Sequence, residues 1–337
     1  MSVRGLTIGA GIAAGIAATM LRRLGSPISF RNQTVFVTGG SRGLGLLLAR
    51  EFVGRGSKVA IAARDKDELS RAEQQLRQDG GEVLTIEADM TMRDEAEASV
   101  RKIEQHFGSV DVLVNNAGTI SVGPMETMTI DDYRNSINTH FWGPYFTTMA
   151  VLPGMKHRRA GRIVNISSIG GKISVPHLLP YCVGKFALTG FSEGLRSELL
   201  KDRVYVTTVC PGLMRTGSPR NAFFKGNNEA EYAWFSISDA LPVISMSANR
   251  AAKQVVDACA RGDAEVVLSM PAKVATIMHG IFPDLTVDLL GVINRFLPAP
   301  GGIGTDMRTG KQSRSKASPG WATALNERAA LENNQIA

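Results

Sequence analysis

Cysteine and histidine are scarce in this chain of 337 residues. The three cysteines form no CxxC pair, and the five histidines form no HExxH or similar pair. A small, odd number of separated cysteines suits a reducing compartment and argues against a disulfide framework. Paired ligands of the kind that hold structural or catalytic metals are also missing. We therefore expect neither a disulfide-stapled domain nor a metal site.

The central part of the chain also lacks a net charge of either sign, although the whole chain carries +7. Residues 1–31 contribute +4 and residues 301–337 contribute +2, whereas residues 32–269 hold 27 basic and 26 acidic side chains. A nucleic-acid-binding face needs clustered positive charge. We therefore expect no nucleic-acid partner, and we interpret the basic flanks as solvated tails or as segments near a membrane.

The first 31 residues form an apolar segment of their own. Residues 6–21 carry no charge, half of them are Gly or Ala, and the run ends at Arg22 and Arg23. As a helix this run would be roughly 24 Å long, which is short for a hydrocarbon core of roughly 30 Å. Arginines directly after the run argue against a cleaved signal peptide. The sequence predicts a membrane anchor or a membrane-lying helix within residues 1–30, with the arginines on the cytoplasmic side; a helix packed on a soluble cytoplasmic protein is the alternative.

Short β-branched runs alternate with stretches of helical length from Gln33 onward. The predicted strands are 34–38, 57–62, 82–87, 111–114, 162–166, 204–209 and 265–268. The predicted helices include 44–53, 66–78, 93–107, 130–156 and 181–200, the fourth with a kink or early break at Gly143 and Pro144. Strands separated by helices are typical of parallel βαβ units with right-handed crossovers. The sequence therefore predicts an α/β fold with a doubly wound parallel sheet.

The chain beyond this core divides into two parts. Residues 271–303 are apolar at helical spacing and are predicted to form amphipathic helices that pack on the body, on a partner subunit or on lipid. Residues 304–337 are polar and rich in Ser, Arg and Lys, so we expect them to be largely disordered.

A glycine-rich turn follows the first predicted strand. It reads Thr38, Gly39, Gly40, Ser41, Arg42, Gly43, Leu44 and Gly45, and a helix is predicted to follow. Glycines there permit a tight turn and bring backbone amides at the positive end of the helix to a pyrophosphate. An NAD(H) site usually has an acid at the end of the second strand, where this chain has Ala63 and Arg64. Because Arg64 and Arg42 could pair with a 2′-phosphate, NADP(H) is favoured and NAD(H) remains possible.

Tyr181 and Lys185 form a YxxxK pair, one turn apart on a predicted helix. An ammonium group near a buried phenol lowers the pKa of the phenol, which makes it a usable general acid or base. Ser168 lies thirteen residues upstream, at the end of a predicted strand, where its hydroxyl could bind a substrate carbonyl.

These motifs together resemble the short-chain dehydrogenase/reductase family. The family's TGxxxGxG is matched by Thr38, Gly39, Gly43 and Gly45, its NNAG by Asn115, Asn116, Ala117 and Gly118, and its serine and YxxxK by Ser168, Tyr181 and Lys185. Further family positions are matched by Asp89, Asn138, Pro211, Gly212 and Thr216. Order and spacing agree over about residues 32–270, and the resemblance covers neither extension.

The resemblance implies a Rossmann-type single domain over residues 32–270, with family roles for the matched residues. Tyr181 is expected to protonate the carbonyl oxygen as hydride arrives from the nicotinamide, while Lys185 binds the nicotinamide ribose and depresses the pKa of the tyrosine. Ser168 is expected to position the carbonyl, and Asn138 to hold a water of the proton relay. The implied cofactor-binding residues are Thr38, Gly39, Ser41, Arg42, Gly43, Leu44, Gly45, Arg64, Asp89, Asn115, Ala117, Gly118, Tyr181, Lys185, Pro211, Gly212 and Thr216.

The segment 214–246 is expected to be the substrate lid, because family members use the region after the sixth strand in that way. It is rich in large apolar side chains, which would either close an apolar pocket or simply pack the lid on the body or on a second subunit. We expect an NADP(H)-dependent oxidoreductase that acts on a lipophilic carbonyl or alcohol, such as a lipid, a sterol or a long-chain ketone, and that forms a homo-oligomer. A non-catalytic NADP(H)-binding scaffold or redox sensor, and an isomerase or dehydratase that uses the same tyrosine, remain alternatives.

Overall fold

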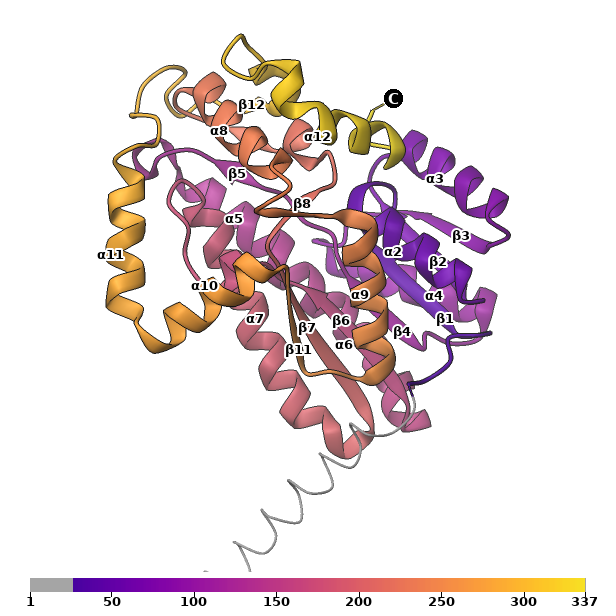
Figure 1. Cartoon of the computed structure of the whole chain (residues 1–337). Coiled ribbons are helices and arrows are strands. Elements are labelled where there is room, and N and C mark those ends of the chain that lie inside the picture. The colour runs from indigo at the N-terminus through magenta and orange to yellow at the C-terminus, as the bar shows by residue number, and fades with distance from the viewer. Residues whose placement is uncertain (1–26, 337) are drawn as a thin grey trace, which may run out of the picture.

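One parallel sheet of seven strands forms the centre of the protein in a computed structural model that describes residues 27–336 (Figure 1). Its strands are β1 (Thr34–Thr38), β2 (Lys58–Ala63), β3 (Glu82–Glu87), β4 (Val112–Asn115), β6 (Gly161–Ile166), β7 (Val204–Pro211) and β11 (Glu265–Leu268). The order is β11-β7-β6-β4-β1-β2-β3, and every neighbouring pair is parallel. The predicted α/β fold is confirmed. From β1 the strand order runs to one edge of the sheet through β2 and β3, and from β4 it runs to the other edge. The place between β1 and β4 is therefore a topological switch point, and ligands bind at such points, beyond the carboxyl ends of the strands.

Helices cover both faces of the sheet. Their bounds are α2 (Gly43–Gly54), α3 (Lys66–Gln78), α4 (Arg93–Phe107), α5 (Ile130–Ile137), α6 (Gly143–Arg158), α7 (Leu179–Leu199) and α9 (Ala248–Arg261). The apolar sides of α2, α3 and α9 are buried in one hydrophobic core with the side chains of one sheet face. Those of α4 and α6, with the end of α7, are buried in a second core on the other face. The sheet is therefore buried on both sides, as a doubly wound sheet requires.

The long helix predicted over residues 130–156 is interrupted at its centre. A π-helical turn covers Asn138–Trp142, between α5 and α6, and the amide of Gly143 donates to the carbonyl of Asn138. The break falls beside Gly143 and Pro144, where the sequence predicts it, because proline has no amide to continue the helical pattern. A π turn of this kind rotates the side chains that follow relative to those before.

The lid region and the C-terminal part of the chain add smaller elements beyond the carboxyl ends of the strands. They are β5 (Ser121–Val122), β8 (Leu213–Arg215), β9 (Phe223–Phe224), α8 (Asn228–Ala240), β10 (Ser245–Ser247), β12 (Arg308–Thr309) and α12 (Gly320–Glu332). β10 pairs with β8, and β12, β9 and β5 form a small three-stranded sheet. The lid is thus built into secondary structure with the C-terminal tail.

The prediction of a largely disordered tail over residues 304–337 is wrong for the residues described. α12 packs against α8, and Ala330 lies directly against Gly217 of the lid. Glu327 forms ion pairs with Arg220 and Arg314. Composition alone missed this order because the tail is held by small and polar side chains, such as Ser313, Asn326 and Ala330, that are buried against another part of the chain. A local count of apolar residues does not register such contacts.

α10 (Met270–Ile281) and α11 (Pro283–Asn294) form a helical hairpin that stands off the body (Figure 1). Of the residues described in α11 none is buried, and in α10 only Ala272 is. Large apolar side chains are exposed along both helices, at the turn between them and just after α11. They are Met270, Val274, Ile277, Met278, Ile281, Phe282, Leu285, Val287, Leu289, Val292, Ile293 and Phe296. Only the start of α10 therefore packs on the body of the same chain, through Ala272, and the partner of the other apolar side chains stays open between a second subunit and lipid.

Within residues 27–336, none of the helices is long and apolar enough to cross a membrane. The apolar run 6–21 and the anchor predicted for it lie outside the described residues.

Candidate active site

Thr38 and the NNAG segment hold the glycine loop in place. The Thr38 hydroxyl accepts hydrogen bonds from the amides of Asn116 (3.0 Å) and Ala117 (3.1 Å). The Asn116 side chain donates to the carbonyls of Thr38 and Gly39, at 3.1 Å each. Two segments almost eighty residues apart in the sequence are thereby joined at the carboxyl ends of β1 and β4, where the switch point lies.

The glycines of this loop are required by space and by backbone conformation. Gly39 and Gly43 have φ angles of +62° and +58°, in the left-handed region that favours glycine. A Cβ on Gly45 would lie 2.0 Å from the carbonyl oxygen of Gly39. The first turn of α2 can therefore approach the strand closely only with glycine, and the loop forms the cradle that a pyrophosphate needs.

The N-terminus of α2, which carries the positive end of the helix dipole, has neither a side-chain cap nor an acidic residue beside it. Its N-cap residue Arg42 gives no side-chain cap, and its first turn contains no acidic residue. Leu44 is buried in the first turn, so its side chain faces the core rather than the groove. Unneutralised amides at a helix start favour an anion, and the residues present fit a dinucleotide phosphate.

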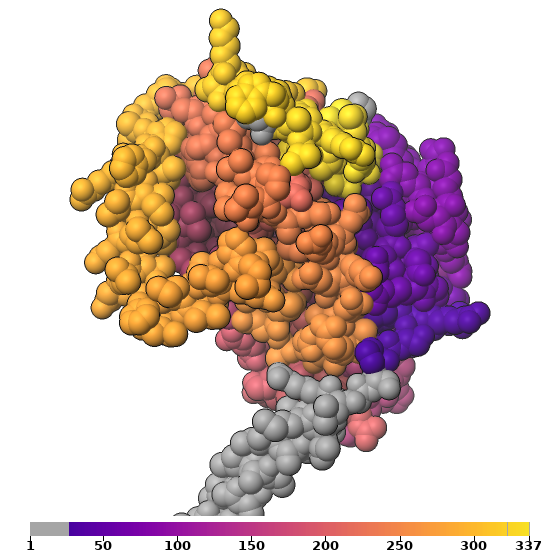
Figure 2. Space-filling view, in the orientation of Figure 1, coloured from indigo at the N-terminus to yellow at the C-terminus, as the bar shows by residue number. Residues whose placement is uncertain are grey.

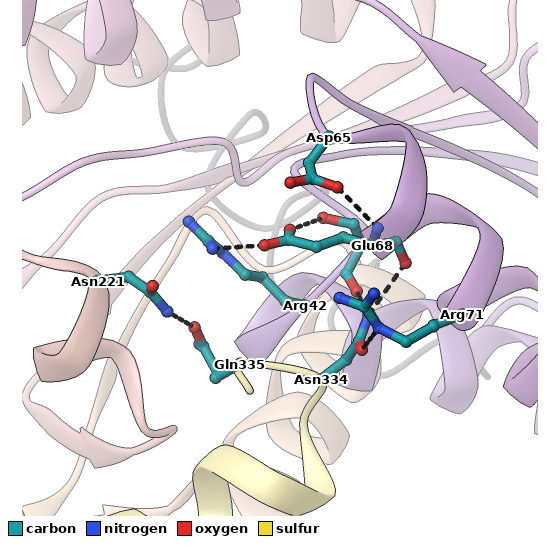
Figure 3. A network of polar contacts seen from close by, with 8 residues as sticks. Arg42, Asp65, Glu68, Arg71, Asn221, Asn334 and Gln335 are labelled. Atoms are coloured by element: carbon teal, nitrogen blue, oxygen red, sulfur yellow. Dashed lines mark hydrogen bonds and ion pairs between the residues drawn. The ribbon is translucent and has the colours of Figure 1, made fainter. Parts of the chain in front are cut away.

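The side of the loop that faces α3 carries the residues predicted to choose between NADP(H) and NAD(H) (Figure 3). Arg42 forms an ion pair with Glu68 at 2.7 Å, and the Ser41 hydroxyl donates to the same carboxylate at 3.0 Å. Arg64, whose side chain is 77% exposed, lies 3.6 Å from Asp89. Asp89 also accepts hydrogen bonds from the amide and hydroxyl of Thr91. Sequence reasoning anticipated the two arginines but missed Glu68, which lies beside them.

Asn115 does not reach the groove with its side chain. The side chain is buried at the end of β4, where it donates to Asn165 (2.8 Å) and accepts from Thr147 (2.7 Å). Its role is to tie β4 to β6 and α6, so only its backbone remains for a cofactor. Gly118, two residues beyond Asn116, lies against His140, and a Cβ there would come within 3.1 Å of the imidazole.

Pro211, Gly212 and Thr216 form the opposite wall of the groove. Pro211 ends β7, and a Cβ on Gly212 would meet the hydroxyl of Ser269 at 2.7 Å. The Thr216 side chain is buried, and its hydroxyl accepts from the amide of Ser218 at 3.1 Å. This wall therefore places Thr216 near the start of the lid, directly after β8.

Ser168, Tyr181 and Lys185 come together at the carboxyl end of β6. Ser168 follows the strand and accepts from the amide of Gly170, while Tyr181 and Lys185 occupy successive turns of α7. The Lys185 ammonium donates to the carbonyl of Ile166 at 2.8 Å and lies 5.7 Å from the centre of the Tyr181 ring. The neighbouring Ser167 hydroxyl bonds to Thr189 and to the Lys185 carbonyl, so it fixes α7 on the sheet.

The pKa values of this pair differ from the expectation drawn from the sequence. Burial raises the pKa of the Tyr181 phenol, and a hydrogen bond with Ser168 only partly opposes that rise. Burial also lowers the pKa of Lys185 to about 7. The expected lowering of the tyrosine pKa is therefore wrong for the protein without cofactor, because desolvation of the buried phenol raises its pKa.

Asn138 is not brought to this group. Its side chain is exposed, and its carbonyl is already bonded to the amide of Gly143. His140, two residues later in the π turn, faces the site instead, because a two-residue step carries the side chain to nearly the opposite side of the helix. The assignment of Asn138 to the proton relay is therefore corrected.

His140 is the residue that sequence reasoning missed. Its ring lies edge-on to Tyr181, and Nε2 is 2.9 Å from the carbonyl of Thr119. Since a carbonyl only accepts, Nε2 carries the proton, and the buried Nδ1 has no hydrogen-bond partner among the described residues. Burial, and next the charge of Lys185, hold the pKa of His140 well below its ordinary value. The imidazole is therefore neutral, with an acceptor free beside the tyrosine. No motif in the sequence connects His140 with Tyr181, so the sequence did not indicate this contact.

The large apolar side chains of the lid are packed together beside Tyr181. Phe224, Tyr232 and Phe235 are buried in a small core with Val122, Leu178 and Cys182. Tyr181 and Trp234 are partly buried at its edge. Burial raises the pKa of the Cys182 thiol, which suits a packing residue rather than a nucleophile. Most of these aromatics therefore attach the lid to the body, and one side of the tyrosine is apolar.

Comparison with known proteins agrees with this site. The family model described as short chain dehydrogenase matches residues 33–224. A dehydrogenase/reductase SDR family protein 7-like from Anopheles gambiae is 32% identical over 256 residues, covering 74% of this chain and 79% of that protein. The dehydrogenase/reductase SDR family member 7B of Mus musculus is 31% identical over 272 residues, covering 78% and 83%.

A solved structure shares the arrangement of the elements. The crystal structure of a short-chain dehydrogenase from Streptomyces avermitilis is 27% identical, with a TM-score of 0.68, and the match covers 80% of this chain and 99% of that one. The fold, the joined motifs and the relatives lead to one conclusion. The chain belongs to the short-chain dehydrogenase/reductase family and is an oxidoreductase that acts on a hydroxyl or carbonyl group with a nicotinamide cofactor.

Proposed function

We propose that this protein is an NADP(H)-dependent carbonyl reductase or hydroxyl dehydrogenase with a lipophilic substrate. The observation that carries the proposal is the grouping of Ser168, Tyr181 and Lys185 between the glycine loop and the apolar core of the lid. A proton donor, a hydroxyl and a cation are thereby collected at one side of a nucleotide groove, with an apolar surface on the other side of the tyrosine.

When bound, NADP(H) supplies or accepts the hydride. The Tyr181 phenol gives a proton to the carbonyl oxygen in reduction and takes one from the hydroxyl in oxidation. Ser168 donates a hydrogen bond to the same oxygen and holds it at the phenol. One N–H of the Lys185 ammonium donates to the backbone carbonyl of Ile166, which leaves two for the ribose hydroxyls and for a water. His140 replaces Asn138 in our assignment, as a neutral acceptor that positions the Tyr181 ring.

The preference for NADP(H) is supported by the charge around the adenosine end of the groove. β2 ends at Ala63 rather than at an acid, and the exposed guanidinium of Arg64 follows it. An acid at the end of that strand would repel a 2′-phosphate, whereas an arginine can pair with one through two hydrogen bonds. Glu68 opposes this preference, because it holds Arg42 and Ser41 in the apo protein.

The lipophilic substrate is supported by two apolar surfaces. The edge of the lid core beside Tyr181 contains the partly buried Ile120, Val175 and Trp234. The hairpin α10–α11 presents an apolar face, and Figure 2 shows a hollow between it and the body, with the magenta middle of the chain at its floor. An apolar approach of this kind favours a lipid, a sterol or a long-chain ketone over a small polar ketone.

Association with the cytoplasmic side of a membrane is the location that fits such a substrate, and it belongs to the same proposal. The hairpin face adds an apolar surface to the run 6–21 of the sequence. A homo-oligomer is proposed through α6 and α7, where Trp142 of the preceding π turn, Met149, Val183 and Phe186 are exposed.

The test is NADPH oxidation with a series of ketones of increasing chain length. We expect turnover to rise with chain length, and Tyr181→Phe to abolish turnover while NADPH still binds. Turnover that is highest with small polar ketones would contradict the lipophilic substrate. Full activity of Tyr181→Phe would contradict the proton-donor role, and a chain that binds NADPH without turning over any compound tested would favour a scaffold or sensor.

A further inference from the structure

The last residues described by the structure lie across the cofactor groove. Asn333–Gln335 follow α12 and run between the lid and the glycine loop, as the yellow segment against the indigo and purple part of the chain shows (Figure 2). We name residues 333–335 the strap. Asn333 and Asn334 are buried, although both are polar and lie near the end of the chain.

On one side the strap is bonded to the glycine loop and to α3. The amide of Gly43 donates to the carbonyl of Asn333 at 2.9 Å. The Asn334 side chain donates to the carbonyls of Ser41 (2.8 Å) and Glu68 (3.0 Å) and accepts from Arg71 (2.8 Å) (Figure 3). Both polar atoms of the Asn334 side chain are thus engaged, in three hydrogen bonds, by the wall that is expected to bind the adenosine side of the cofactor.

On the other side the strap is bonded to the start of the lid. The Asn333 side chain donates to the backbone carbonyl of Thr216 at 3.4 Å. The Asn221 side chain donates to the side-chain oxygen of Gln335 (Figure 3). The strap therefore bridges the two walls between which a pyrophosphate and a nicotinamide lie in this family.

The strap also covers the space above the glycine loop. A Cβ added to Gly43 would meet the Gln335 side-chain amide at 2.7 Å, and the Gly43 amide is already used by Asn333. That amide stands at the start of α2, where the helix end attracts a phosphate. A cofactor phosphate and the strap thus compete for the same donor and for the same space.

We propose that the strap occupies part of the cofactor site and gates entry to it: NADP(H) enters the groove only when residues 333–335 are displaced. α12 remains attached to α8 during this step, because its contacts lie on the lid and do not depend on the strap. The strap is short and is held mainly by single hydrogen bonds, each of which contributes modestly, so displacement at thermal rates is physically reasonable. This inference rests on the placement of the cofactor along the glycine loop.

The experiment measures NADPH association and dissociation by stopped-flow fluorescence, with an excess of NADP⁺ as the chase for dissociation. Three variants are compared with the full chain: a chain that ends at Glu332, Asn334→Ala, and Asn294→Ala as the matched control. Asn294 is an exposed asparagine at the end of α11. Thermal unfolding of each variant checks that the fold is kept.

We expect the association rate constant of the shortened chain to rise by at least about fivefold, the factor that the loss of a single hydrogen bond supports. The dissociation rate constant should not rise, because a strap that competes with the cofactor does not cover it once it is bound. Asn334→Ala should raise the association rate to a smaller extent, and Asn294→Ala should leave both rates unchanged. Equal association rates in the full and shortened chains would overturn the gate, and so would slower association of the shortened chain. Should the shortened chain fail to fold, Asn334→Ala decides by the same criteria. If the full chain and all variants fail to bind NADPH, the assigned cofactor placement fails instead, which is a distinguishable result.

Discussion

The ring of His140 stands edge-on to the ring of Tyr181, with centroids 5.3 Å apart and planes at 89°. The arrangement is held by the bond from Nε2 to Thr119 and by the absence of a side chain on Gly118. The imidazole thus occupies the side of the tyrosine ring that faces the π turn. A neutral histidine therefore sits where the sequence led us to expect an asparagine.

His140→Phe tests the positioning of the tyrosine. The phenyl ring keeps the edge contact but loses both nitrogen atoms, so kcat should fall by roughly tenfold while the dissociation constant for NADPH stays the same. Because His140 is neutral in the native protein, both limbs of the pH profile of kcat should stay at their original pH. His106→Phe, at an exposed position of α4, is the control. A shifted acidic limb would instead mean that His140 itself titrates during turnover.

Lys185→Met tests the cost of burying the ammonium group. The pKa of Lys185 is lowered from 10.5 to about 7 in the folded protein, so between these values the unfolded chain binds more protons than the folded one. Wild-type stability should therefore rise from pH 7 toward pH 10. The variant, free of this penalty, should be more stable than wild type at pH 6, by more than about 1.4 kcal/mol, the equivalent of one pKa unit.

That difference should shrink as the pH approaches 10, because the lysine of the folded wild type is then neutral, whereas the lysine of the unfolded chain, with its pKa of 10.5, is still largely charged. Urea unfolding of the cofactor-free protein at pH 6, 8 and 10 measures it. Lys201→Met, at an exposed position, should show no such trend. A wild-type advantage at pH 6 would refute the argument.

Glu68→Gln tests how the protein chooses its cofactor. Removal of this carboxylate frees Arg42 and Ser41 from their present partner and removes a negative charge from the expected position of a 2′-phosphate. We expect the dissociation constant for NADPH to fall by roughly fivefold to tenfold, with little change for NADH. Arg64→Ala should act in the opposite direction on NADPH alone. Fluorescence titration with both cofactors measures this, and Glu73→Gln, also on α3, is the control. An equal effect on both cofactors would exclude a role at the 2′ position.

Ile281→Glu combined with Phe296→Glu tests the apolar hairpin. Both side chains are exposed, so the fold should be kept, but a charge at each place should weaken binding to neutral phosphatidylcholine vesicles. Co-sedimentation of the full chain measures the effect. Val243→Glu, an exposed apolar residue outside the hairpin, serves as the comparison. Equal sedimentation of all three proteins would remove the hairpin from the membrane proposal.

The sheet could be predicted from the sequence because its signals are local. Each of the seven predicted strands overlaps an observed one, since short β-branched runs bounded by turn residues define strands without knowledge of their partners. The glycine loop and the Tyr181–Lys185 pair were found for the same reason, because the residues of each motif lie within a few positions of one another in the sequence.

What the sequence did not reveal depends on pairs far apart along the chain. Asn334 and Ser41 are separated by 293 residues, and no periodicity connects them. The exchange of Asn138 for His140 depends on one π turn, which changes the side chain that faces α7 without any change in composition. The pKa values of Tyr181 and Lys185 depend on how completely both are buried, which becomes known only when the whole site has been built.

The position of the strap has a practical consequence for anyone who handles this protein. Because Gln335 lies between the lid and the glycine loop, a purification tag fused close behind it would emerge beside both. A histidine-rich or acidic tag there would contact the same wall that selects the cofactor. Cofactor affinities measured on C-terminally tagged protein would therefore describe the tag as well as the enzyme, and an untagged C-terminus is the safer choice for every measurement described above.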